Sequence, residues 1–212
     1  MPESITVLAD PGTVEEAVEG LPPGFGPGLA GRAAFGIAIV FALFQLWTAA
    51  YGTLPSQVVR AMHVGFLLLL GFGLVGNLVA KTPLTKVLFW ALAVAGFLTG
   101  VYNWVFYADI IRRTGFLTPL DLVVGATAII LVFGAARRIM GWPLAVISAI
   151  FLAYCFFGQY LPSPLIHRGY STELIIEHFG FGTEGIYGTP IYVSAAYIFI
   201  FVVFAASSSV PG

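Results

Sequence analysis

The chain has 212 residues, of which 59% are hydrophobic and only 9% are charged, and its formal net charge is −1. A soluble globular domain carries roughly 25% charged residues, so this composition excludes a water-soluble particle and predicts an integral membrane protein. Its 9 basic and 10 acidic residues form no basic stripe that could neutralise a phosphate backbone, which excludes nucleic acid as an expected partner.

The first 31 residues differ from the rest of the chain. They combine a Pro/Gly-rich stretch at positions 21–28 with a cluster of acidic residues. No basic start leads into a short apolar core, so the segment is not a secretory signal. We expect an acidic, flexible cytoplasmic tail over residues 1–31. Its acidic residues are Glu3, Asp10, Glu15, Glu16 and Glu19.

Six apolar segments follow the tail. They cover residues 33–51, 61–80, 87–108, 122–136, 139–161 and 186–206. A helix needs about 20 apolar residues to cross the hydrocarbon core, and the short fourth segment can borrow residues 118–121. Only helices and closed barrels satisfy their backbone groups in lipid, and the Phe-Leu-Leu-Leu-Leu run at 66–70 lacks the alternation of a barrel strand. The predicted fold is all-α, a polytopic membrane helix bundle of about six transmembrane helices.

Basic residues between the segments indicate an orientation. With the N-terminus inside, the inner connections hold five basic residues and the outer connections four, which is a small positive-inside bias. The inner residues are Arg32, Lys81, Lys86, Arg137 and Arg138. The outer residues are Arg60, Arg112, Arg113 and Arg168.

The longest polar connection, residues 165–185, predicts one interfacial amphipathic helix. Ser171 can cap a helix with Glu173 in its first turn. Its apolar face is expected to lie along the membrane surface, and the glycines at 180, 182 and 185 end it. The residues of that face are Leu174, Ile175, His178 and Phe179.

Ionisable residues avoid the centres of the predicted spans. Asp109, Arg112, Arg113 and Asp121 gather between the third and fourth segments. They form either an ion or substrate site or a solvated loop with two local acid–base pairs, and the loop is favoured because nothing forces these groups into hydrocarbon.

Polar residues inside the spans either line a path or join neighbouring helices by hydrogen bonds, and the second use is the commoner one. They are Gln45, His63, Asn77, Thr99, Asn103, Ser148 and Gln159. The small residues Gly96 and Gly100, and the alanines at 145, 149 and 153, also predict close helix packing.

Known catalytic patterns are missing from the sequence. His63, His167 and His178 lack the spacing of a zinc site, the single Cys155 excludes an intrachain disulfide and a cysteine cluster, and no phosphate-cradling glycine loop occurs. We therefore expect no enzyme and assign no catalytic, cofactor-binding or metal residue. The substrate-binding residues stay unassigned.

Four stretches resemble the fused permeases of tripartite ATP-independent periplasmic (TRAP) transporters of the TAXI-associated type. They are RRTGFLTPLD at 112–121, AARRIMGWPL at 135–144, the set FLAY, GQYLP and HRGYS between 151 and 171, and EGIYG with VSA between 184 and 195. Together they cover roughly residues 107–206, whereas the first hundred residues match mainly in hydropathy. The family commonly has an acidic residue before AARR, where this chain has Gly134.

The resemblance implies a domain layout. Residues 32–140 correspond to a small membrane component of four helices, and residues 141–163 correspond to the connector helix of the fusion. Residues 164–212 correspond to an interfacial helix and the first helix of the large component. Because the family continues through many more helices, we expect a truncated or split permease that is not active alone.

The resemblance also implies a function for the complete system. An extracytoplasmic TAXI-type solute-binding protein delivers a small organic solute, typically an organic acid. The large component then moves the solute inward, driven by a cation gradient, usually of sodium. The implied location is the bacterial inner membrane, with membrane lipid and the remaining large component as partners. The alternatives are a non-transporting membrane scaffold, an inert fragment of a split gene, and a small self-contained channel or carrier.

Overall fold

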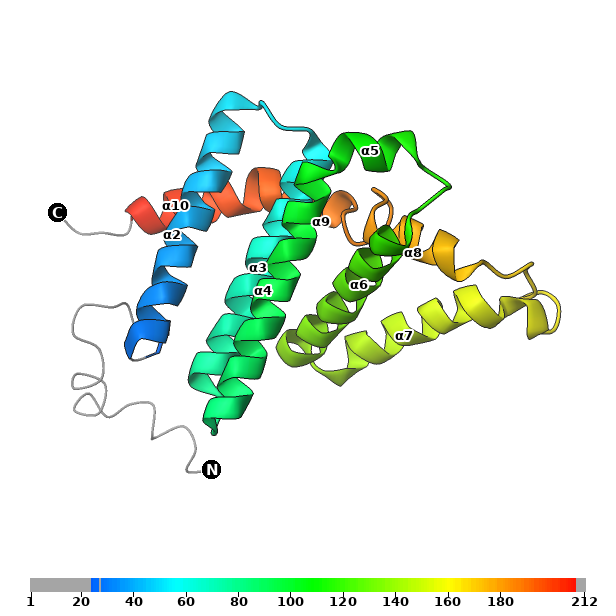
Figure 1. Ribbon diagram of the computed structural model, residues 1–212, viewed down its shortest axis with the longest axis horizontal. Coiled ribbons are helices and arrows are strands. Elements are labelled where there is room, and N and C mark those ends of the chain that lie inside the picture. Colours follow the sequence, from blue (N-terminus) through cyan, green and yellow to red (C-terminus); the bar gives the residue numbers. More distant parts are fainter. Residues whose placement is uncertain (1–23, 27, 209–212) are drawn as a thin grey trace.

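The computed structural model describes residues 24–26 and 28–208, so most of the predicted acidic tail lies outside the described residues. All regular structure within that part is helical, which confirms the all-α prediction (Figure 1). The long helices are α2 (Gly28–Tyr51), α3 (Ser56–Leu78), α4 (Pro83–Val105), α6 (Pro119–Met140) and α7 (Trp142–Phe157). The short elements are α5 (Tyr107–Arg112), η2 (Gly158–Tyr160), α8 (Thr172–Gly180), α9 (Thr189–Val193), η3 (Ser194–Ile198) and α10 (Phe199–Ser208).

Five helices are long and apolar enough to cross a bilayer: α2, α3, α4, α6, and α7 together with η2. The chain is therefore a multi-pass membrane protein. The sixth predicted segment corresponds to α9, η3 and α10, and its apolar part, Thr189–Ala205, is shorter than the other five. It is also interrupted by the π-helical turn η3, so five helices of the described residues have the length and composition of a span, with a shorter sixth apolar helix after them.

The N-terminal boundary of the first span differs from the prediction. Helix α2 begins at Gly28, so the last residues assigned to the tail are helical. Gly31 is buried against the Gly26 carbonyl oxygen, where no side chain would fit. The close backbone contact lets the helix start before Arg32.

Helix α3 lies at the centre of the bundle and buries more of its surface than any other span in the described residues. Its main partner is α4, and glycines bring the two backbones together. A Cβ atom on Gly100 would lie 2.7 Å from the Ala61 carbonyl oxygen, and one on Gly96 would lie 2.7 Å from Leu68 Cβ. The packing predicted for Gly96 and Gly100 is confirmed.

Helix α6 begins at Pro119, within the residues 118–121 that could extend the fourth predicted segment. Thr118 accepts from the Asp121 amide, the Asp121 carboxylate accepts from the Thr118 amide, and Pro119 occupies the first turn. This reciprocal capping box satisfies N–H groups that have no partner inside the helix. The fourth span therefore reaches 22 residues.

Helix α7 leaves the bundle after Gly141, which has a positive φ of 85°. None of its residues from 142 to 157 is buried. Ala149 and Ala153 are exposed, so the close packing predicted for the small-residue repeat of this helix does not occur at these two positions.

Helix α8 confirms the predicted cap and corrects the predicted face. The Ser171 hydroxyl accepts from the Leu174 amide at 3.3 Å. Ile175 and Ile176 are buried, while Leu174 and His178 are exposed. The buried face is rotated because α8 packs on α6, where Gly180 meets the Gly125 backbone.

The final segment, α9 to α10, runs across α2 and α3 in Figure 1 and not alongside them. It contacts both helices near the end where α2 stops and α3 starts. This crossing brings residues more than 125 positions apart in the chain into contact, and it creates the site described next.

Candidate functional site

A buried set of hydrogen bonds joins the final segment to the bundle. Gln45 on α2, His63 on α3 and Ser194 on η3 form its centre, which we call the polar seam. The Gln45 Nε2 atom lies 2.9 Å from His63 Nδ1 and 2.9 Å from the Ala195 carbonyl oxygen. His63 Nε2 lies 3.1 Å from Ser194 Oγ. Three separate segments therefore meet through three side chains.

The hydrogen bonds of the polar seam fix the state of His63. A carbonyl oxygen only accepts, so the Gln45 amide nitrogen must face Ala195 and act as donor. The same nitrogen faces His63 Nδ1, which must then accept. His63 is therefore neutral, carries its proton on Nε2, and donates to Ser194 Oγ.

Aromatic side chains enclose the polar seam. His63 packs against Phe41 of α2 at 5.2 Å and against Phe199 of α10 at 6.0 Å, measured between ring centroids. Gln45 is fully buried and His63 is 1% exposed. Because an unpaired polar group in such surroundings costs free energy, the hydrogen bonds require the final segment to stay in this position.

The π-helical turn η3 presents a backbone carbonyl to the polar seam. The Phe199 amide donates to the Ser194 carbonyl five residues earlier, which widens the turn relative to an α-helix. The Ala195 carbonyl accepts from the Gln45 side chain. Single π-turns are often found at functional positions in helices.

Two polar side chains of α3 extend this attachment toward the end of the bundle. Arg60 Nη1 donates to the Tyr187 carbonyl oxygen at 2.9 Å, and its guanidinium lies 4.7 Å from the centre of the Tyr192 ring. Gln57 donates to the Phe181 carbonyl oxygen. The first two turns of α3 thus contact the stretch from 181 to 192 at three positions.

A small cavity of about 350 Å³ adjoins the polar seam. Thr48 and Ser56 from the bundle face Tyr192 and Tyr197 from the final segment across it. Thr48 Oγ1 donates to the Gln45 carbonyl oxygen, whereas the side-chain Oε1 of Gln45 is buried and has no hydrogen-bond partner within the described residues.

The charged cluster predicted between the third and fourth segments differs in part from its prediction. Arg112 and Asp109 form the expected exposed pair at 3.6 Å. Arg113 and Asp121 also pair, at 3.0 Å, but Asp121 is fully buried, so the interpretation as a solvated loop is wrong for it. Tyr102 and Thr118 also donate to this carboxylate, which makes it a structural junction of α4, α6 and the loop between them.

The other polar residues of the spans mostly act within or between neighbouring helices. Trp90 Nε1 of α4 donates to Asn77 Oδ1 of α3 at 3.1 Å. Thr99 and Asn103 donate to carbonyls of their own helix. Ser148 and Gln159 lie on α7 and η2, away from the polar seam.

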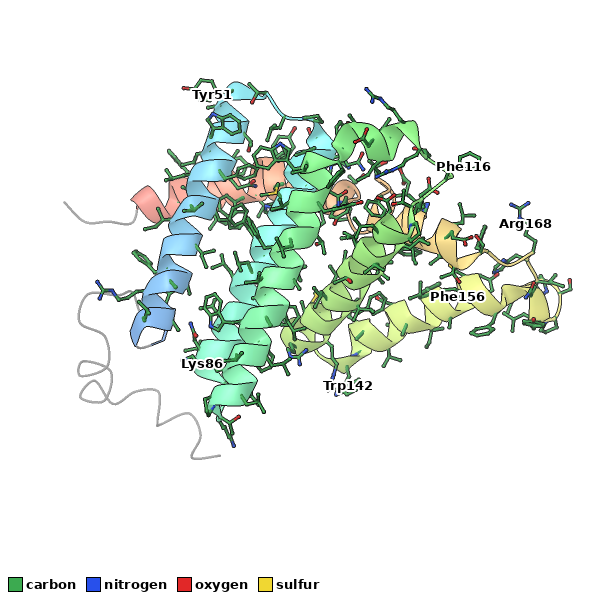
Figure 2. The ribbon with its side chains drawn as sticks, viewed as in Figure 1. Tyr51, Lys86, Phe116, Trp142, Phe156 and Arg168 are labelled. Carbon is green, nitrogen blue, oxygen red and sulfur yellow. The ribbon has the colours of Figure 1, made fainter. Side chains whose placement is uncertain are left out.

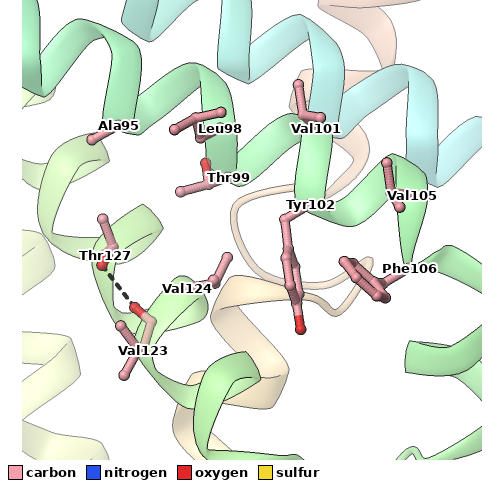
Figure 3. A pocket seen from close by; sticks show the side chains of 10 residues that line it. All are labelled: Ala95, Leu98, Thr99, Val101, Tyr102, Val105, Phe106, Val123, Val124 and Thr127. Carbon is pink, nitrogen blue, oxygen red and sulfur yellow. Dashed lines mark hydrogen bonds between the residues drawn. The ribbon is translucent and has the colours of Figure 1, made fainter.

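A shallow cavity of about 400 Å³ between α4 and α6 is lined almost entirely by apolar side chains (Figure 3). Thr127 bonds to the Val123 carbonyl of its own helix, and the Tyr102 hydroxyl donates to Asp121 at 2.6 Å. This cavity has the character of a lipid-facing depression.

The remaining histidines have local roles. The Gly169 amide donates to His167 Nδ1, so the ring donates from Nε2 to the Tyr154 carbonyl. His178 is exposed on α8. Across residues 24–26 and 28–208, no group of three metal-ligating side chains occurs.

Sequence reasoning named Gln45 and His63 but did not pair them, and it missed Ser194 as their partner. Hydropathy does not show which residues of α2 and α3 face each other. It also does not show that a segment about 130 residues after His63 crosses both helices. Comparison with protein-family models, curated proteins and solved structures found no match.

Proposed function

We propose that the chain is the scaffold part of a TRAP-type secondary transporter. In this proposal it resides in the bacterial inner membrane with its N-terminus in the cytoplasm. It anchors the large component, which imports a small organic solute, typically an organic acid, with a sodium gradient. Its outer face docks a TAXI-type solute-binding protein.

The observation that carries the proposal is the attachment of the final segment to α3. In the fused permeases that the sequence resembles, the chain passes from a small four-helix component through a connector into the large component. Here the stretch after α7 returns to the bundle and is held by Gln57, Arg60 and His63. A scaffold must hold its transport component in this way, through buried and specific contacts.

The distribution of charge supports the proposed orientation. Figure 2 shows Lys86 and Trp142 at one end of the bundle and Tyr51 and Phe116 at the other. The end that begins α2 and α4 and finishes α6 carries five basic residues and no acidic residue within the described residues. These residues are Arg32, Lys81, Lys86, Arg137 and Arg138. A basic end of this kind is typical of a cytoplasmic face.

A co-purification experiment tests the scaffold role. The full chain is tagged and co-expressed with the large component of a TAXI-type TRAP system encoded beside its gene. We expect a stable complex that also captures the solute-binding protein. The paired change Q45L/H63L should weaken the complex, while T127V, which alters a bond within one helix, should not.

Two outcomes would favour the alternatives. If the large component never associates with the chain, a non-transporting membrane scaffold for another partner, or an inert fragment of a split gene, becomes the better account. Solute uptake by vesicles that contain this chain alone would instead indicate a self-contained carrier.

A further inference from the structure

An open groove lies between the start of α2, at residues 28–33, and the face of α4 from Lys86 to Leu98. Its volume is about 1040 Å³, and its walls are mostly small and apolar side chains. On α2 the groove is lined by Leu29 and Ala33, and on α4 by Trp90, Ala91 and Val94. Lys86 lies at one end of it, at the basic end of the bundle in Figure 2.

The length of the groove matches half a bilayer. Lys86 and Leu98 both line it, and 12 residues of helix at 1.5 Å per residue span about 18 Å. One leaflet contributes about 15 Å of the roughly 30 Å hydrocarbon core. A cation at one end and an apolar channel as deep as one leaflet are the two requirements of a phospholipid.

The basic end offers charge to an anionic headgroup. Within the described residues, only Arg112 and Arg113 are in ion pairs, so Lys86 has no acidic partner there. Arg137 and Arg138 are engaged by the aromatic rings of Trp142 and Phe89. Lys86 is thus the basic side chain that both lines the groove and has no such contact.

We propose that this groove is a specific site for an anionic phospholipid. The phosphate pairs with Lys86 at the membrane surface, and an acyl chain begins between α2 and α4 and continues along α4 as far as Leu98. Basic pockets between transmembrane helices bind anionic headgroups in this manner. Trp90 lines the groove about one helical turn from Lys86, and its bond to Asn77 fixes the ring.

The lipid fits better than the other candidate occupant, the acidic N-terminal segment of this chain. The carboxylates of Glu15, Glu16 and Glu19 could pair with Lys86. However, the groove continues for about three turns of apolar wall, which a segment with that charge would leave uncovered. The proposal is independent of transport and of which leaflet the basic end faces.

Trp90 provides the reporter for a direct test. The other three tryptophans are at least 41% exposed, so W47F, W104F and W142F leave Trp90 as the single tryptophan of the full chain. Its fluorescence is quenched by brominated lipid in the groove. In vesicles we compare brominated phosphatidylglycerol with brominated phosphatidylcholine, and size-exclusion profiles check that each variant is folded.

We expect phosphatidylglycerol to bind at Trp90 about fivefold more tightly than phosphatidylcholine, which equals about 1 kcal/mol. K86Q should remove that preference. The matched variant K81Q, at an exposed position outside the groove, should keep it. A91F, which fills the groove from an exposed position, should reduce quenching by both lipids.

Three results would overturn the proposal. The first is an equal affinity of the unmodified site for the two lipids. The second is an equal loss in K81Q and K86Q, which would indicate a general surface charge effect. The third is a preference that emerges only in E15Q/E16Q/E19Q, which would mean that the N-terminal segment occupies the groove.

Discussion

His63 is the side chain at which α2, α3 and the final segment meet. Its two ring nitrogens are used in different ways, one accepting from Gln45 and the other donating to Ser194. The chemistry of the site is therefore that of a fixed neutral imidazole, enclosed by phenylalanine rings. Its role in this position is to hold three segments together.

Replacing His63 should loosen the final segment. H63A leaves the buried Gln45 amide N–H and the half-buried Ser194 hydroxyl without this partner, which costs about 1–3 kcal/mol. We expect hydrogen exchange of the amides from 194 to 200 to accelerate, with a lower midpoint of thermal unfolding. T127V should change neither quantity. Unchanged exchange in H63A would show that the polar seam does not hold the segment.

Asp121 and Asp109 test the difference between a buried and an exposed ion pair. D121N removes a charge from a site where Arg113, Tyr102 and Thr118 converge, and hydrogen bonds to charged groups contribute about 1.5–3 kcal/mol each. D109N breaks a pair that is mostly solvated, with an expected effect below about 1 kcal/mol. Equal losses of thermal stability in the two variants would contradict the buried junction.

At the scale of elements, the α3–α4 pair depends on glycine. G100A places a methyl group 2.7 Å from the Ala61 carbonyl oxygen, so the helices must separate, and we expect a loss of thermal stability. G71A makes the same chemical change in α3 where no atom lies within 4 Å, and it should be neutral or stabilising by up to about 1 kcal/mol. If both variants behave alike, close packing at Gly100 is not important.

The elements themselves were largely predictable, since helix length in lipid is set by hydrophobicity. The cap at Ser171 and the extension of α6 to Pro119 were also predictable, because capping residues lie within one turn of the atoms they satisfy. The buried face of α8 was not predictable. It depends on Gly125, about 50 residues earlier, which lets Ile176 approach α6.

The crossing of α2 and α3 by the final segment was also not predictable from the sequence. Its hydropathy resembles that of a span, and residues of the π-turn at 194–198 contact Gln45 and His63. The crossing is accompanied by hydrogen bonds between distant polar groups, and hydropathy does not encode such pairing.

At the scale of the whole molecule, the basic and mixed-charge ends predict a single orientation. In cells, after Cys155 is replaced by alanine, a cysteine at Phe116 should react with a membrane-impermeant maleimide. A cysteine at Lys81 should react only after permeabilisation. The reverse pattern would invert the proposed topology, and labelling at both positions would argue against a single orientation.

The proposed scaffold role uses features of single residues, of helices and of the whole bundle. In it the polar seam fixes the final segment, α3 lies at the centre of the bundle, and the basic end faces the cytoplasm. In this proposal the chain supports a transport component, and the solute path lies in the large component. Support thus belongs to this chain, and solute movement belongs to the large component.

Sodium-driven uptake in proteoliposomes tests whether this chain is a scaffold for a separate transport component. Vesicles are prepared with this chain alone, with the large component alone, and with both, each supplied with the solute-binding protein and its radiolabelled organic acid. We predict sodium-dependent uptake only when both membrane parts are present, and reduced uptake with Q45L/H63L. Uptake by this chain alone, or undiminished uptake by the large component without it, would contradict the scaffold role.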